Sequence, residues 1–130
     1  MSQDNLKNEY EKICQDILKE EHLRFCGLIS GSGELITGGF RDGVTPMEND
    51  EEQKKVFQEL AVRVSHRKNF DSKMGRVKYS ASRREYLVMM SFPIGGNILL
   101  ITADPHVNID RLAFKIIEKM GQQWYDFYGL

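Results

Sequence analysis

The stretch RVKYSASRREYLVMMSFPIGGNILLI, residues 76–101, decides the fold of this chain. In residues 76–82, apolar and polar side chains alternate with a period of two, which is typical of a strand with one face in water. Residues 86–90 and 98–101 are almost uninterrupted apolar runs, as in strands that are covered on both faces. Polar residues, proline and glycine predict the turns between these strands. The turns fall at residues 82–84 and 93–97.

Two further strands are predicted upstream of this stretch. Residues 25–29 and 34–37 are short apolar runs on either side of a glycine-rich turn, residues 30–33, which predicts a β-hairpin. A glycine-rich turn can also cradle a phosphate, but phosphate loops lead from a strand into the start of a helix. Here the turn leads into a second strand, and the hairpin interpretation is favoured.

Three amphipathic helices are predicted around these strands, because apolar residues recur there at intervals of three and four. They cover residues 4–20, about 50–68, and 109–120, and the segment between residues 41 and 49 is a loop. Asp4, either Asn49 or Asp50, and Asn108 are the predicted N-caps. Glu51 and Glu52 then lie in the first turn of the second helix, where the helix dipole favours carboxylates.

The order of elements is therefore α-β-β-α-β-β-β-α, in an α+β domain. Short turns between the strands favour a single five-stranded antiparallel sheet, and the three helices must bury their apolar stripes against both of its faces. A chain of 130 residues supports one hydrophobic core of this kind. We expect one domain over residues 1–130.

The composition is that of an average soluble protein, with 41% hydrophobic and 28% charged residues and a net charge of -1. The amino terminus has no basic start followed by an apolar run, and no apolar run is long enough to span a membrane, so neither secretion nor a membrane span is expected. The two cysteines, Cys14 and Cys26, lie in different predicted elements and are expected to be buried free thiols in the cytoplasm.

Two stretches of the sequence resemble the roadblock/LC7 family and its profilin-like relatives. Residues 25–36 look like the opening hairpin of that family, and residues 99–112 look like its last strand running into its last helix. The resemblance implies a homodimer that aligns third strands edge to edge and packs second helices together. It also implies a platform for small GTPases or for motor and signalling assemblies.

The resemblance also implies which residues form the self-interface. The interface would use the exposed part of the second helix and the edge of the third strand, and its candidate residues are Val56, Phe57, Leu60, Arg76, Val77, Lys78 and Tyr79. The third strand is unusually basic for the family. Arg76 and Lys78 would repel their symmetry mates unless acids such as Glu52 or Glu59 of the second copy neutralise them.

Positive charge is concentrated in residues 63–84, and aromatic side chains are concentrated at the carboxyl end. The basic segment is either a solvated surface or a docking face for an anionic partner, such as an acidic protein, a nucleic acid or a lipid surface. No nucleic-acid recognition motif accompanies it. The aromatics either pack on the first helix or the sheet, or form an exposed patch. Candidate partner-binding residues are Arg63, Arg67, Lys68, Arg83, Arg84, Trp124, Phe127 and Tyr128.

No residue pattern predicts catalysis, a metal site or a cofactor. His22, His66 and His106 have no spacing suited to a shared metal, and Ser30 and Ser32 lie in no nucleophile motif. The sequence therefore favours a non-enzymatic dimeric adaptor. One alternative is a small-ligand sensor of PAS-like or profilin-like type, with a pocket between the sheet and the second helix. Another is nucleic-acid binding through the basic segment.

Overall fold

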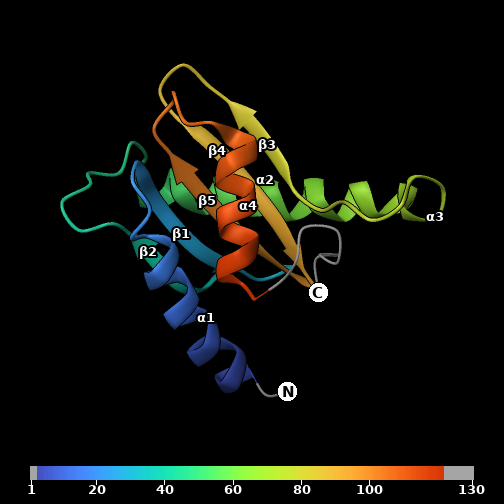
Figure 1. Ribbon diagram of the computed structural model, residues 1–130. Helices are drawn as coiled ribbons and strands as arrows, with labels where there is room; N and C mark the ends of the chain where they lie inside the picture. Colours follow the sequence, from blue (N-terminus) through green and yellow to red (C-terminus); the bar gives the residue numbers. More distant parts are fainter. Residues whose placement is uncertain (1–2, 122–130) are drawn as a thin grey trace.

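The computed structural model describes residues 3–121 and contains a five-stranded antiparallel sheet (Figure 1). The strands lie in the order β2-β1-β5-β4-β3, and each neighbouring pair is antiparallel. This confirms the fold class predicted from the sequence. The strands are β1 (Leu23–Ile29), β2 (Leu35–Phe40), β3 (Ser80–Arg83), β4 (Val88–Ile94) and β5 (Asn97–Ala103).

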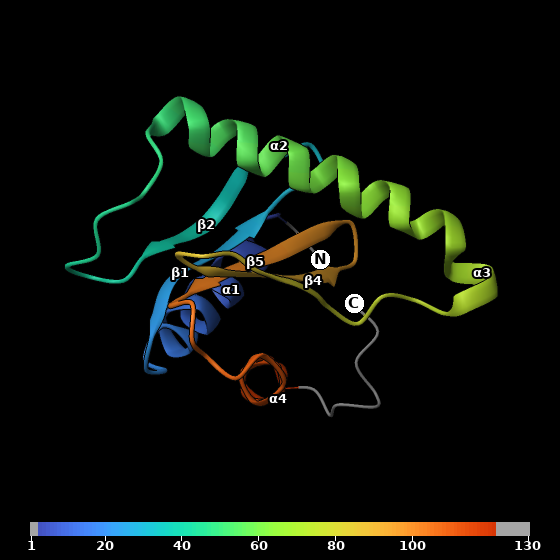
Figure 2. The same cartoon turned by 90° about the horizontal axis from the view of Figure 1, so that it is seen from above.

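Three long helices cover the two faces of the sheet, so that the sheet is the middle of three layers (Figures 1 and 2). Helices α1 (Gln3–Ile17) and α4 (Ile109–Lys119) lie on one face, and α2 (Asp50–Arg67) lies on the other. A short 3-10 turn, η1 (Lys68–Phe70), and a one-turn helix, α3 (Asp71–Met74), follow α2 directly.

The apolar run at residues 98–101 of β5 is explained by burial on both faces of the sheet. Ile98 and Leu100 pack in the cluster beneath α2, whereas Leu99 and Ile101 pack in the cluster beneath α1 and α4. Side chains of a strand alternate between faces, so a strand with a hydrophobic cluster on each side needs apolar residues at every position. The predicted burial of residues 98–101 on both faces of the sheet is confirmed, and β5 is the middle strand.

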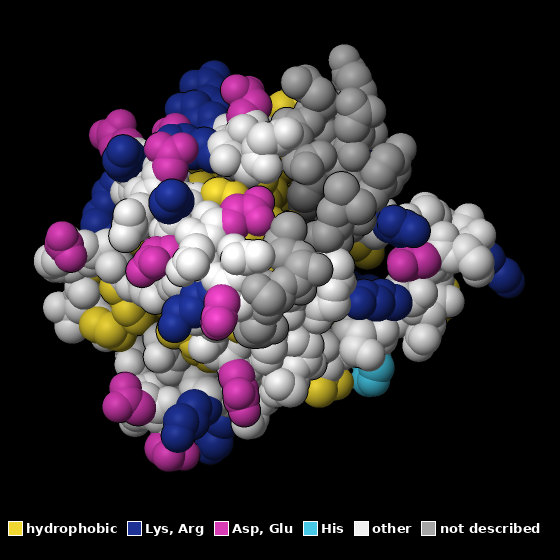
Figure 3. Space-filling view, turned by 90° about the horizontal axis from the view of Figure 1, so that it is seen from below, with side chains coloured by type: hydrophobic (Ala, Val, Ile, Leu, Met, Phe, Trp, Pro, Cys, Tyr) yellow, Lys and Arg dark blue, Asp and Glu magenta, His cyan; other side chains and the backbone are white. Residues whose placement is uncertain are grey.

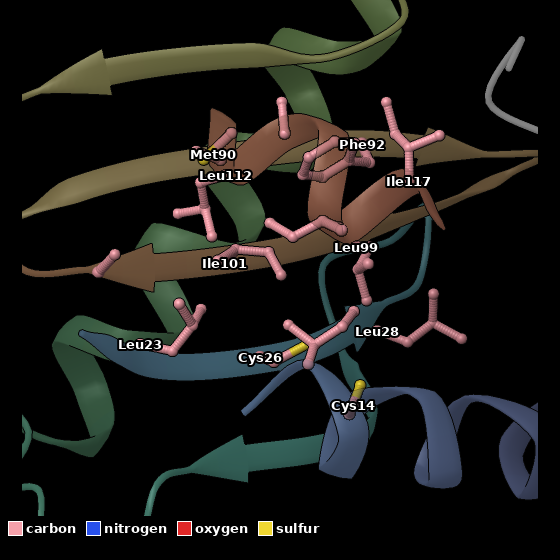
Figure 4. Close-up of a cluster of buried hydrophobic side chains, with 14 of the residues drawn as sticks. Cys14, Leu23, Cys26, Leu28, Met90, Phe92, Leu99, Ile101, Leu112 and Ile117 are labelled. Carbon is pink, nitrogen blue, oxygen red and sulfur yellow. The ribbon is translucent and has the colours of Figure 1, made fainter. Parts of the chain in front are cut away.

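Both cysteines lie in the core on the α1 and α4 side (Figure 4). Cys14 of α1 and Cys26 of β1 are almost completely buried and free, as predicted. Burial raises the pKa of the Cys26 thiol well above its usual value, and the neighbouring Cys14 adds to the shift. Because the thiolate is the reactive form, Cys26 acts here as a small apolar side chain.

The predicted helix caps at Asn49 and Asn108 are confirmed. The Asn49 side chain accepts a hydrogen bond from the Glu52 amide at 2.9 Å, and Glu52 Oε1 accepts one from the Asn49 amide at 3.0 Å. The reciprocal pair is a capping box, which fixes the start of α2. The Asn108 side chain accepts a hydrogen bond from the Arg111 amide at 3.0 Å and so caps α4.

The third strand begins later than predicted, at Ser80 and not at Arg76. Ser80 pairs with Ser91 of β4, so the same register would place Lys78 opposite Pro93. Proline has no amide hydrogen to donate to a continued ladder. Pro93 itself lies within β4, paired with Ile98 on the β5 side, and not in the predicted turn. Between α2 and β3, residues 68–74 form η1 and α3.

Strand β2, the edge of the sheet opposite β3, has an irregular backbone. Its register with β1 shifts between the Leu28 and Ile29 pairings, and Gly38 in its middle has a φ of 106°. A side chain is rarely compatible with that φ value. Glycine is required at this position for a second reason, because a Cβ atom would overlap the carbonyl oxygen of Cys26.

Arg41, directly after β2, connects the β-hairpin to the end of α1. Its Nε donates to the Leu18 carbonyl at 3.1 Å, and its Nη2 donates to the Leu18 and Glu20 carbonyls at 2.7 and 2.6 Å. The last carbonyl groups of a helix have no partner within the helix. Leu18 and Glu20 lie in the turn that follows α1, so Arg41 holds this turn against the edge of the sheet.

We expect the substitution Arg41→Met to lower the free energy of unfolding by about 2 kcal/mol, because it removes charged hydrogen bonds to half-buried carbonyls. Urea denaturation followed by circular dichroism measures this change. Arg24→Met is the matched control, since the Arg24 side chain donates one exposed hydrogen bond among residues 3–121, to the Thr45 carbonyl. The control should change stability by less than about 1 kcal/mol. Equal losses in the two variants would contradict the role given to Arg41.

Candidate self-association surface

Strand β3 ends the sheet, and no strand among residues 3–121 pairs with its outer edge. It is short, and its residues Ala81 and Ser82 are exposed. An open edge presents unpaired backbone N–H and C=O groups that can pair with a strand of another chain. The outer edge of β3 is therefore a candidate surface for self-association.

The carboxyl end of α2 lies over β3. Arg67, in the last turn of α2, donates a hydrogen bond from Nη1 to Ser80 Oγ of β3 at 2.8 Å. Burial, and the neighbouring positive charge of Arg63, lower the pKa of the Arg67 guanidinium. This contact marks the point where α2 crosses the last strand of the sheet. Residues after Arg67 lie beyond it.

The two ends of β3 are held by contacts to α4 and to the loop before α4. Arg83 donates from its two terminal nitrogens to the carbonyls of Pro105 and Val107, the second at 2.8 Å. Before the strand, the Tyr79 hydroxyl donates to Asp110 Oδ1 at 2.7 Å, and its ring stacks on Phe92 with centroids 5.7 Å apart. Burial, followed by this hydrogen bond, raises the pKa of the Tyr79 hydroxyl, which stays a donor. These contacts fix the position of β3 within a single chain, without any contribution from a partner.

The structure places the predicted interface residues in three environments. Phe57 and Leu60 are only 6% and 2% exposed, because they pack beneath α2 on the sheet of their own chain. They cannot contact a second copy, so their assignment to the interface is corrected. Val56 is half-buried at the margin of the same cluster. Residues 76–79 all precede the paired part of β3, with Arg76 exposed and Val77, Lys78 and Tyr79 half-buried.

The predicted partner-binding residues also divide into groups. Arg63, Lys68 and Arg84 are exposed and lie on α2, on η1 and in the turn between β3 and β4. Arg67 and Arg83 make the internal hydrogen bonds given above, so their guanidinium groups hold β3 in place. Trp124, Phe127 and Tyr128 lie outside the described residues.

Three exposed apolar side chains near β3 were missed by the sequence interpretation. Val62 is 54% exposed on the side of α2 away from the sheet, and Phe70 and Met74 are 55% and 81% exposed beyond its end. We name residues 68–74 the α2 extension. It projects from the body of the protein beyond the sheet (Figure 2), and in Figure 3 it lies at the right of the view with Lys and Arg side chains around it. Phe70 and Met74 are isolated apolar residues in a polar stretch, so no periodic pattern in the sequence indicated them.

The alternative function as a small-ligand sensor requires a pocket between α2 and the sheet, and a small cavity lies there. It opens near the start of α2 and is lined by apolar side chains that include Phe25, Phe40, Val56 and Met89. Its free interior is about 30 Å³, which is room for a water molecule or two. Pockets for small ligands are roughly ten times larger. This hollow gives the sensor interpretation no support.

The histidines and acids form no recognisable metal centre in the described part of the chain, where no group of three His, Cys, Asp or Glu residues could hold an ion. His22 Nδ1 lies 3.2 Å from Asp104 Oδ2 in an exposed contact between the chain before β1 and the end of β5. Within residues 3–121, no helix has the length and apolar character needed to cross a membrane.

The whole sequence, residues 1–130, matches the family DUF6659, which is described as a family of unknown function. The chain belongs to this family. Among curated proteins, none matches the sequence significantly. For this DUF6659 member, solved structures are therefore the informative comparison.

Several solved structures share the fold of this DUF6659 chain. MglB of Myxococcus xanthus has a TM-score of 0.67 at 11% identity, covering 88% of this chain and 84% of that chain. The gliding protein MglB of Thermus thermophilus has a TM-score of 0.63 at 12% identity, covering 88% and 90%. A Roadblock/LC7 domain of Streptomyces avermitilis has a TM-score of 0.63 at 9% identity, covering 85% and 91%. The DUF6659 chain has the roadblock/LC7 fold.

Proposed function

We propose that this DUF6659 protein is a non-enzymatic adaptor that forms a homodimer through the edge of β3 and the adjoining side of α2. The observation that carries the proposal is the open outer edge of β3 beneath the projecting end of α2. A second copy related by a two-fold axis would continue the sheet there, and its own α2 would lie on the same face.

Repulsion between Arg76 and Lys78 of the two copies is a smaller obstacle to this dimer than the sequence suggests. The paired part of β3 is Ser80–Arg83, so Arg76 and Lys78 lie before it and not in its ladder. At the edge itself, the exposed residues Ala81 and Ser82 are small and uncharged. Small uncharged residues let the backbones of two strands approach without like charges in direct opposition.

A four-residue strand cannot supply a stable interface alone, because specific interfaces bury about 800 Å² on each partner. The side of α2 that faces away from the sheet is the adjoining surface, and Val62 gives it an exposed apolar position. Glu59 of the second copy is exposed and can neutralise basic residues of the first, whereas the Glu52 carboxylate already accepts a hydrogen bond in the capping box of α2. The predicted interface thus moves from Phe57 and Leu60 to the opposite side of the same helix.

The partner of this dimer is proposed to be a small GTPase or another signalling protein in the cytoplasm. The roadblock/LC7 fold supports this class of partner, and the free thiols of Cys14 and Cys26 support a reducing compartment. The exposed basic residues Arg63, Lys68 and Arg84 give the adaptor a surface for acidic groups of the partner. Such attraction would weaken as salt is added.

Sedimentation equilibrium at tens of micromolar tests the dimer, and we expect the mass of two chains. A strict monomer would overturn the proposal. The partner class is tested separately, by titrating the dimer with a purified small GTPase of the same organism loaded with GDP or with a GTP analogue. If neither form binds at low salt, the GTPase is excluded as the partner and the dimer proposal stands.

A further inference from the structure

A groove between the second half of α2 and strands β3 and β4 combines two positive charges with hydroxyl groups, at a place where α2 lies over the sheet (Figure 2). Arg63 and Arg67 line it from α2, and Ser80, Ser82 and Ser91 line it from the sheet. The two arginines are four residues apart, a spacing that makes their side chains neighbours on a helix. Among residues 3–121, no Asp or Glu lines this groove. Its polar side chains can all donate hydrogen bonds, which is what an anion requires.

The two guanidinium groups of the groove are not neutralised within the described part of the chain. No ion pair among residues 3–121 involves Arg63 or Arg67. Arg67 Nη1 donates to Ser80 Oγ at 2.8 Å, which uses one of its five N–H donors and orients the guanidinium plane. Burial, and then the charge of Arg63, lower the pKa of the Arg67 guanidinium. An anion placed between the two groups would counter both causes.

The helix dipole alone does not explain this arrangement. Basic residues are favoured near the carboxyl end of any helix, and Arg67 lies in the last turn of α2. That attraction is available to a side chain that extends into water, as the exposed Lys68 does on η1. It gives no reason for Arg67 to be half-buried beside a second cation and a hydroxyl group. The placement is accounted for if the groove holds a ligand of opposite charge.

The size and charge of the groove select the ligand. Its free interior is about 50 Å³, and a water-sized group needs roughly 10–15 Å³. The groove therefore has room for one small anion and none for a whole organic ligand. A phosphate group carries a charge of about -1.5 to -2 at pH 7 and has three strong acceptor oxygens. These match two guanidinium groups and the adjoining hydroxyls, whereas a carboxylate, with a single charge, would leave one guanidinium without a counter-charge.

We propose that this groove binds inorganic phosphate or the phosphate group of a small, soluble phosphomonoester. Arg63 and Arg67 hold the phosphate oxygens from the α2 side, and the exposed Ser82 donates from β3. The rest of a larger ligand lies outside the groove, beside the edge of the sheet. All of these residues belong to one chain, so the site does not depend on the dimer proposed above.

The test is a titration with sodium phosphate at constant ionic strength, followed by the amide resonances of the protein. We expect saturable shifts at residues 80–82 and 89–91. Arg63→Gln should raise the dissociation constant by about tenfold or more, since it removes a charged hydrogen-bond donor. Arg63 is exposed, so circular dichroism should show an unchanged fold. Lys73→Gln is the matched control, because it removes one positive charge from the same basic segment but from α3, outside the groove, and it should leave the affinity unchanged.

Three results would overturn the inference. Shifts that do not saturate, or equal losses in Arg63→Gln and Lys73→Gln, would mean that anions only collect around a diffuse basic surface. Sodium acetate should bind at least tenfold more weakly than phosphate, and equal binding would make the groove a carboxylate site. Phosphatidic acid carries a phosphomonoester on a lipid, so if the protein binds vesicles containing it through Arg63 but does not bind soluble phosphate, the ligand belongs to a membrane. A monomeric protein that binds phosphate would overturn the dimer and support this inference.

Discussion

Ala81→Glu is expected to raise the dissociation constant of the dimer by roughly 100-fold, which corresponds to about 2.7 kcal/mol. Antiparallel pairing of β3 with the β3 of a second copy places Ala81 near the symmetry axis, so the substitution brings two carboxylates close together. Like charges in opposition at an interface cost several kcal/mol. Sedimentation velocity over a concentration series measures the change.

The effect should be confined to association. Ala81 is exposed, so the free energy of unfolding of the monomer should change by no more than about 0.5 kcal/mol. Asn8→Glu is the control, because it adds the same charge on the exposed side of α1, which packs near β1 and β2 at the other end of the sheet. A dimer that tolerates Ala81→Glu as well as it tolerates Asn8→Glu would place the interface away from β3.

Gly38→Ala is expected to lower the free energy of unfolding by about 3 kcal/mol. The φ of 106° is unfavourable for alanine by roughly 1–2 kcal/mol. In addition, the new Cβ would overlap the carbonyl oxygen of Cys26 and lie 2.6 Å from the Cα of Gly27. Both contacts are with backbone, which cannot rotate away as a side chain can, so the strain adds to the cost. Thermal and urea denaturation measure the loss.

Gly39→Ala separates this local cause from a general effect of glycine loss in β2. Gly39 is the next residue of the same strand, has no left-handed φ, and its added Cβ would meet no atom within 4 Å. At such a site alanine restricts the unfolded chain, and stability should stay equal or rise by a few tenths of a kcal/mol. Similar losses at both positions would contradict the explanation for Gly38.

Much of the fold could be predicted from the sequence because each central strand has its own local signature. The apolar run that ends at Ile101 predicts burial on both faces, and the caps at Asn49 and Asn108 are determined by neighbouring residues. The start of β3 could not be predicted in this way. It depends on which residue of β4 lies opposite, and the position of Pro93 in that register is a property of the assembled sheet.

The candidate surface was less accessible to sequence reasoning. An apolar stripe identifies the side of a helix that is buried, and in α2 that side packs on its own sheet, which is why Phe57 and Leu60 were assigned to the wrong surface. The exposed Val62 is a single apolar residue outside the apolar stripe of α2, so it forms no periodic pattern of its own. Phe70 and Met74 lie in a polar stretch, where periodicity cannot show that a helical turn holds both residues beyond the edge of the sheet.

The irregular backbone of β2 limits how many copies can assemble. A sheet can grow indefinitely by edge pairing only if both of its edge strands can pair with a strand of another copy. In β2 the register shift and the left-handed Gly38 interrupt the regular spacing of backbone donors and acceptors that another strand would need. Assembly through β3 would therefore stop at a closed pair, and polymerisation into filaments would have no second site from which to continue.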